Sequence, residues 1–154
     1  MKKLILIIAL LGVVASACDH KVMYDHNYRV DPKGWHMDDS LVFNLHADDT
    51  VNTYLCCIDI RNLCDYPYSN IYFFIQTIYP DGALASDTNI EFTLAQPDGK
   101  WLGRVNGRYI DGRYPLCYFH FPQQGDYQFI VRHAMRDSLL YGIRNIGMHV
   151  ELKK

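Results

Sequence analysis

Residues 54–78 read YLCCIDIRNLCDYPYSNIYFFIQTI and hold two apolar runs with a polar segment between them. The runs, residues 54–60 and 71–78, are rich in aromatic and β-branched side chains, which fit a pleated and buried surface. Residues 61–70 contain asparagine, aspartate, proline and serine, which favour turns and interrupt helices. The stretch therefore predicts two central strands joined as a β-hairpin with a wide loop.

Strand patterns recur on both sides of this stretch. Residues 40–47, 89–95 and 146–152 alternate apolar and polar side chains, as half-buried strands do. Residues 116–121 and 127–132 predict a second hairpin, because a Pro-Gln-Gln-Gly turn joins them. Strands spaced by about ten residues, without a βαβ rhythm, are typical of an antiparallel sandwich. We therefore expect an all-β fold, an Ig-like or jelly-roll-like antiparallel β-sandwich of seven to eight strands.

Several other segments have a local interpretation. Residues 103–112 are polar and glycine-rich, which predicts a surface loop, and residues 134–141 predict one short helix. Trp35 follows a turn, so we expect it to fill one end of the core. The Gly-Asp-Tyr entry at Tyr127 is similar to the tyrosine corner of immunoglobulin-like sandwiches. The side chains expected to form the core are Leu55, Ile58, Phe73, Ile75, Phe92, Leu94, Phe119, Phe129 and Val150.

The composition indicates one folded domain. A chain of 154 residues, 49% of them hydrophobic, is large enough to form a stable core without disulfides or structural metal sites. Its net charge is −2, with both signs interspersed. Because there is no basic stripe, no nucleic-acid partner is expected.

The N-terminus has the pattern of an export signal. Two lysines precede an apolar segment too short to span a bilayer, and Ala-Ser-Ala follows, so residues 1–17 predict a signal peptide. Cys18 comes next, which matches a lipobox, although Ala-Ser-Ala is also a site for ordinary signal peptidase. We expect residues 18–33 to be a lipidated N-terminus and tether, with room for an edge strand, and residues 34–154 to be the sandwich.

No catalytic or metal-binding motif stands out. There is no nucleophile elbow, zinc-protease motif or phosphate-binding loop, and Ser69 and Ser86 lie in expected turns. His149 and Glu151 share a strand face, where an isolated pair is usually solvated. We therefore expect no catalytic residue, no metal and no cofactor.

The four cysteines after Cys18 leave two alternatives open. Cys56, Cys57, Cys64 and Cys117 are an even number in an exported chain, which is compatible with one or two disulfides. Adjacent cysteines on a strand point to opposite faces, so Cys64 in the following loop is the natural partner for one of them. The alternative is that Cys56 and Cys117 are small buried apolar residues.

An ordered set of short motifs resembles the GldH family of gliding-motility lipoproteins and covers most of the mature chain. These motifs are Arg61, DYPYSNIY at 65–72, DT at 87–88, LA at 94–95, PDGKWLG at 97–103, GDY at 125–127, AMR at 134–136, Leu140, GI at 142–143 and Gly147.

The resemblance implies a non-enzymatic envelope lipoprotein. It would be an accessory of the gliding motility machinery and of the protein secretion system coupled to it, acting through contacts with other envelope lipoproteins or membrane proteins. It also implies lipidation at Cys18 and attachment to a membrane, the periplasmic side of the outer membrane rather than the inner membrane. The family-like polar and aromatic residues that core packing does not require are the candidate partner contacts: Asp65, Tyr66, Tyr68, Asn70 and Arg136.

A different class of function is a carbohydrate-binding sandwich at the cell surface. Aromatic side chains in or near loops could stack on sugar rings, and the candidates are Tyr66, Tyr68, Trp101, Tyr109 and Tyr114. An exposed coplanar row of these rings would favour sugar binding, whereas a broad mixed patch would favour protein contacts. A hydrolase is the weakest alternative, because no nucleophile or carboxylate pair can be named.

Overall fold

The computed structural model describes residues 21–153. This part of the chain forms eleven strands and no helix. In chain order the strands are β1 (Val22–Arg29), β2 (Trp35–His36), β3 (Leu41–Ala47), β4 (Thr53–Leu63), β5 (Asn70–Ile78), β6 (Leu84–Thr93), β7 (Arg104–Asn106), β8 (Tyr109–His120), β9 (Gly125–His133), β10 (Leu139–Leu140) and β11 (Ile143–Leu152).

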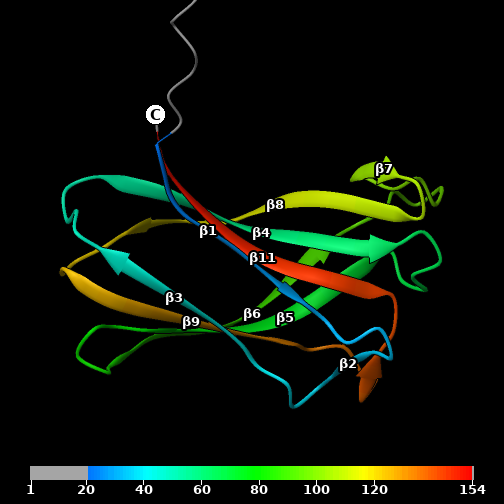
Figure 1. The fold of residues 1–154 in the computed structure, drawn as a ribbon, viewed down its shortest axis with the longest axis horizontal. Coiled ribbons are helices and arrows are strands. Elements are labelled where there is room, and N and C mark those ends of the chain that lie inside the picture. Colours follow the sequence, from blue (N-terminus) through cyan, green and yellow to red (C-terminus); the bar gives the residue numbers. More distant parts are fainter. Residues whose placement is uncertain (1–20, 154) are drawn as a thin grey trace, which may run out of the picture.

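The strands form two packed layers (Figure 1). One sheet has the order β1-β11-β4-β8-β7, the other has the order β3-β9-β5-β6, and β10 pairs with β2 in a small ribbon. Neighbouring strands are antiparallel in all three. The predicted antiparallel β-sandwich is therefore confirmed.

The inward faces of the two sheets form one apolar core. Its largest fully buried side chains include Phe43, Phe73, Phe121, Tyr127 and Phe129. Of the predicted core residues, the structure buries Ile58, Phe73, Ile75, Phe92, Leu94, Phe129 and Val150. The other two are only partly buried: Phe119 packs against the core, whereas Leu55 lies outside the core cluster.

Both predicted hairpins are wrong. β4 pairs with β11 and β8, whereas β5 pairs with β6 and β9 in the opposite sheet. β8 and β9 are likewise divided between the two sheets. β4 lies between β11 and β8, and β5 lies between β9 and β6, so both are central strands as predicted. The turn segments 64–69 and 121–124 therefore cross between layers, which turn composition alone does not reveal.

Two local predictions are also wrong. Residues 103–112 are not a loop: β7 and the start of β8 form a hairpin that turns at Gly107, where φ is +61°. Residues 134–141 are not a helix, because their backbone groups bond to distant segments. Ala134 N donates to Tyr72 O at 2.7 Å, and Met37 N donates to Ser138 O at 2.9 Å. The helix-like composition of this segment is overridden by these tertiary bonds.

The sandwich begins before residue 34, the boundary predicted from the sequence. β1 is an edge strand that pairs with β11 along its length. At its start, Lys21 O accepts from Leu152 N at 3.0 Å, and Lys153 N donates to Thr53 O at 2.9 Å. These residues define the terminal end of the sandwich, where the two ends of the described chain meet (Figure 1). The predicted signal peptide and Cys18 lie outside the described residues.

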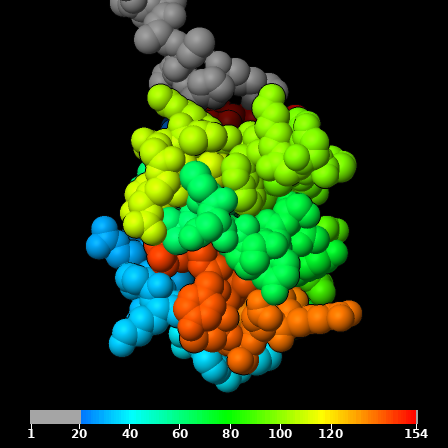
Figure 2. Space-filling model, turned by 90° about the vertical axis from the view of Figure 1, so that its right-hand side faces the viewer, coloured from blue at the N-terminus to red at the C-terminus, as the bar shows by residue number. Residues whose placement is uncertain are grey.

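The opposite end, the loop end, is formed by the connections 30–40, 64–69, 107–108 and 134–142 (Figures 1 and 2). Trp35 is 2% exposed there, and its Nε1 donates to Asp39 O at 3.0 Å, so it fills the core end as predicted. At the other end the Tyr127 hydroxyl donates to Gln123 O at 2.8 Å. That bond, to the backbone a few residues upstream, is the predicted tyrosine corner.

Candidate interaction sites at the loop end and on the outer sheet face

Tyr66 supports the loop end and does not lie at the surface. It is 4% exposed, and its hydroxyl donates to Asn70 O at 3.1 Å. Gly142 adopts a φ of +86° directly against it, where a Cβ would come within 2.9 Å of the Tyr66 ring. Burial raises the pKa of the Tyr66 phenol. Tyr66 was predicted to be a partner contact, but its ring is enclosed by the fold and is not presented at the surface.

Tyr68 and Arg136, by contrast, share one hollow at the loop end. Its volume is about 430 Å³, and Tyr72, Asn89, Ala134 and Met135 complete the lining. The Tyr68 hydroxyl donates to Asp137 Oδ2 at 2.6 Å, which raises the pKa of the phenol. In Figure 2 the green segment around residue 65 lies beside the orange segment around residue 138. We name the hollow lined by these six residues the Tyr68–Arg136 hollow.

Arg136, like Arg29, is an exposed arginine whose charge is not paired within residues 21–153. Its side chain is exposed and has no hydrogen bond, ion pair or ring contact with residues 21–153. By comparison, Arg113 is bonded to Asp59, and Arg132 lies 6.0 Å from the Phe74 ring centroid. Within the described part of the chain, Arg136 is therefore neither buried nor paired.

The remaining candidate contacts, Asp65 and Asn70, do not line this hollow. Asp65 is exposed on the 64–69 connection. Asn70 Nδ2 donates to Glu91 Oε1 at 2.6 Å, which ties β5 to β6. Of the five predicted residues, the structure brings Tyr68 and Arg136 into a common site and leaves the others with separate surroundings.

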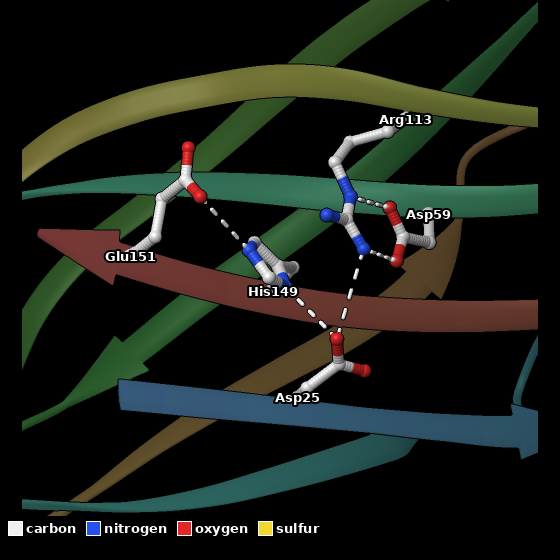
Figure 3. Close-up of polar contacts among 5 residues, drawn as sticks. All are labelled: Asp25, Asp59, Arg113, His149 and Glu151. Atoms are coloured by element: carbon white, nitrogen blue, oxygen red, sulfur yellow. Dashed lines mark hydrogen bonds and ion pairs between the residues drawn. The ribbon is translucent and has the colours of Figure 1, made fainter. Parts of the chain in front are cut away.

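A five-residue ionic cluster lies on the outer face of the β1-β11-β4-β8-β7 sheet (Figure 3). His149 Nδ1 is 2.8 Å from Asp25 Oδ2, and His149 Nε2 is 3.3 Å from Glu151 Oε2. Arg113 donates to Asp59 through Nε and Nη2, both at 2.7 Å, and its Nη2 is 3.7 Å from Asp25. The bonds to Asp59 raise the pKa of Arg113.

His149 was expected to be solvated, but the structure buries it. It is 3% exposed, because β11 has β1 on one side and β4 on the other, and its cross-strand neighbours are Asp25 and Cys57. An imidazolium donates to both flanking carboxylates, whereas a neutral ring donates to only one. The cluster therefore links the edge strand β1 to β11, β4 and β8 through hydrogen bonds and ion pairs.

The ionic cluster has the features of a structural tie. Cys57 beside it is 3% exposed, and burial raises the pKa of its thiol, so it is held as the poorly nucleophilic thiol. Within residues 21–153 no group of three histidine, cysteine or acidic side chains has a geometry that could hold a metal ion. Asp25, Asp59 and Arg113 were missed by sequence reasoning, since their pairing depends on strand order.

The four cysteines of the described chain are free. Cys56 and Cys117 are direct cross-strand neighbours, and the hydrogen bond between them, together with burial, raises the pKa of Cys56. Cys57 points to the other face, as expected for adjacent strand residues. Cys64 Sγ lies 3.6 Å from Gly107 O and has no thiol beside it among the described residues. The structure thus brings together a different pair from the predicted one.

The loop aromatics considered for sugar stacking form no exposed row within residues 21–153. Tyr66 is buried, and Tyr68, Trp101, Tyr109 and Tyr114 are half-buried. The Tyr109 ring has the Arg61 guanidinium 5.5 Å from its centroid, and the Tyr114 ring packs against the core. These rings therefore do not form the exposed coplanar surface on which sugars would stack.

Together the fold and these sites define a small antiparallel β-sandwich with hollows and ionic ties on its surface. The chain belongs to the GldH lipoprotein family, whose sequence model matches residues 22–150. The predicted resemblance is confirmed.

Two relatives agree with this assignment. The chain is 32% identical over 149 residues to the gliding motility lipoprotein GldH homolog of Christiangramia forsetii, covering 90% of this chain and 89% of that protein. It is 28% identical over 156 residues to the gliding motility lipoprotein GldH of Flavobacterium johnsoniae, covering 96% of this chain and 95% of the relative.

Among solved structures, a family GH115 4-O-methyl-α-glucuronidase aligns over 91% of this chain with a TM-score of 0.44 and 15% identity, covering 19% of the enzyme.

Within residues 21–153 there is no helix with the length and apolar character needed to cross a membrane.

Proposed function

We propose that this protein is a non-enzymatic, lipid-anchored accessory of the gliding motility machinery and of the protein secretion system coupled to it, acting through protein contacts. Family membership and the names of both relatives support the motility context. The observation that carries the contact mechanism is the Tyr68–Arg136 hollow, where an exposed guanidinium has no partner within the described residues. Arginine and tyrosine are among the residue types enriched at the energetic centres of protein interfaces.

The placement of the chain ends is consistent with this function. Cys18 precedes Lys21 by three residues, a reach of about 10 Å in an extended chain. Lipidation of Cys18 would therefore hold the terminal end close to the membrane. The eleven residues of β4 run from that end to the loop end, a length of about 36 Å. The Tyr68–Arg136 hollow would then face away from the membrane, toward other envelope lipoproteins or membrane proteins.

We place the anchor in the outer membrane, facing the periplasm. The signal peptide pattern and the cysteine at residue 18 support export and acylation. More than one acyl chain, as lipoproteins carry, gives stable rather than transient membrane attachment.

The test is a charge reversal in the host, Arg136→Glu, with Lys100→Glu as its matched control. Lys100 is an exposed cation in the turn before Trp101 and does not line the Tyr68–Arg136 hollow. Envelope fractions are cross-linked before detergent extraction, and the proteins recovered with each variant are identified. We expect Arg136→Glu to lose specific envelope partners and to impair secretion, and gliding where the host glides, while Lys100→Glu behaves as the parent.

Equal partner recovery by the two variants would remove the contact mechanism. A deletion strain that secretes normally, together with polysaccharide binding by the purified protein, would instead support the carbohydrate-binding alternative.

A further inference from the structure

A second hollow at the loop end is lined by four arginines, which come from four separate segments. Arg29 ends β1, Arg61 lies in β4, Arg108 is in the β7–β8 turn and Arg144 is in β11. The hollow has a volume of about 410 Å³, and none of its lining residues is acidic. We name it the arginine hollow. It shares no lining residue with the Tyr68–Arg136 hollow.

Three of the four guanidiniums are held in place by the fold. Arg61 is bonded to Asp111 through two contacts, of 2.5 and 3.1 Å. The guanidiniums of Arg61 and Arg108 lie 5.5 and 5.9 Å from the centroid of the Tyr109 ring. Arg144 Nη1 donates to Pro32 O at 3.1 Å. A site whose donors are already oriented loses less entropy when a ligand binds.

The charges in the arginine hollow do not cancel. Asp111 neutralises Arg61, but Arg29, Arg108 and Arg144 have no ion pair with any residue from 21 to 153. Three like charges around one small space repel one another, even after screening by water. An anion of more than one charge would convert that repulsion into attraction.

The geometry of guanidinium selects the class of anion. Its planar fork matches the paired oxygens of carboxylate and phosphate. A carboxylate supplies a single charge, whereas a phosphate monoester carries about −1.5 to −2 and three acceptor oxygens that several guanidiniums can share. The excess of three positive charges therefore matches phosphate better than a lone carboxylate.

We propose that the arginine hollow binds a phosphate-bearing ligand. Arg61, Arg108 and Arg144 act as the oriented donors. The exposed side chain of Arg29 closes over the ligand. The phosphate can come from a free ester or from the headgroup of a phosphorylated lipid, since both present the same oxygens.

Binding is measured by isothermal titration calorimetry on the full chain, purified in a non-ionic detergent at low salt. Sodium pyrophosphate is the soluble probe, and vesicles of phosphatidic acid in phosphatidylcholine, compared with phosphatidylcholine alone, test the lipid source. We expect saturable binding of pyrophosphate that weakens as sodium chloride is added. Arg29→Gln and Arg144→Gln should each weaken it roughly tenfold or more, because each removes charged hydrogen bonds.

The matched control is Arg136→Gln, which removes the same charge from an exposed arginine outside the arginine hollow. It should leave the affinity for pyrophosphate within about twofold of the parent, because no hydrogen bond to the ligand is lost. Binding to phosphatidic acid vesicles alone would support the proposal and assign the phosphate to a lipid. Since Arg136 carries the contact mechanism proposed above, its variant also separates failure of one proposal from failure of the other.

Two results would overturn the inference. One is the absence of binding to both phosphate probes, or binding that Arg29→Gln and Arg144→Gln leave unchanged. The other is arginine-dependent binding of a ten-residue glutamate peptide without binding of pyrophosphate, which would make the hollow a contact for an acidic protein. Because Arg144 also bonds to the backbone, Arg108→Gln serves as a further variant if Arg144→Gln does not fold.

Discussion

Replacing Phe73 with alanine tests how the central strand β5 is packed. The side chain has 0% exposure, and its ring centroid lies 5.8 Å from that of Trp35 and 5.7 Å from that of Phe92. Removing the ring forfeits its transfer free energy and leaves a cavity between these rings. Truncating a buried phenylalanine costs roughly 3–5 kcal/mol of unfolding free energy. With a urea m-value of about 2 kcal/mol/M, the midpoint should fall by roughly 1.5–2.5 M.

The neighbouring residue supplies the control. Phe74 points to the outer face, is 41% exposed and lies under the Arg132 guanidinium at 6.0 Å. Phe74→Ala removes the same atoms, but it mainly removes the surface contact with Arg132. We expect it to lower the free energy of unfolding by about 0.5–1 kcal/mol. Urea unfolding of the two variants, followed by circular dichroism, compares the midpoints directly. If Phe74→Ala proves as damaging as Phe73→Ala, the assigned faces of β5 are wrong.

Three further predictions concern a buried histidine, the proposed lipidation site and a pair of thiols. His133 is 2% exposed, and burial lowers its pKa. The unfolded chain therefore binds more protons below about pH 6.5, so the free energy of unfolding should fall as the pH drops from 7 to 5. In urea titrations His133→Phe should flatten this pH dependence, and an unchanged pH profile would contradict the prediction. Cys18→Ala should leave the precursor uncleaved or release the protein to the soluble fraction, whereas a processed, membrane-bound variant would rule out the lipid anchor. Diamide, which takes up the two thiol hydrogens, should join Cys56 to Cys117 and leave Cys64 free in non-reducing peptide maps, and a bridge through Cys64 would refute the strand register.

Local features of the fold were predictable because their causes are local. The alternation in residues 40–47 predicted β3, and the structure buries Phe43 and Leu45 while exposing Asn44 and His46. The tyrosine corner needs only a turn and a strand entry next to each other in the chain. In these cases the residues that decide the structure are within a few positions of one another.

The pairing of strands was not predictable in the same way. The apolar runs on both sides of residues 61–70 suggested partners, yet β4 and β5 lie in opposite sheets. Apolar composition indicates that a strand lies inside a sheet but does not specify which strands pair with it, so it carries no information about the neighbours. The burial of His149 follows from the same fact, because it depends on β1 and β4 lying on either side of β11.

By itself the sequence determined the family, the all-β class, the two aromatic supports at Trp35 and Tyr127, and the absence of a recognisable catalytic motif. Only the tertiary structure decided which charges meet. It left Arg136 without a partner within the described residues, and it gathered Arg29, Arg61, Arg108 and Arg144 around one space from positions spread over the chain. The physical reason is that electrostatic sites depend on distances of a few ångströms, which strand order creates between residues far apart in sequence.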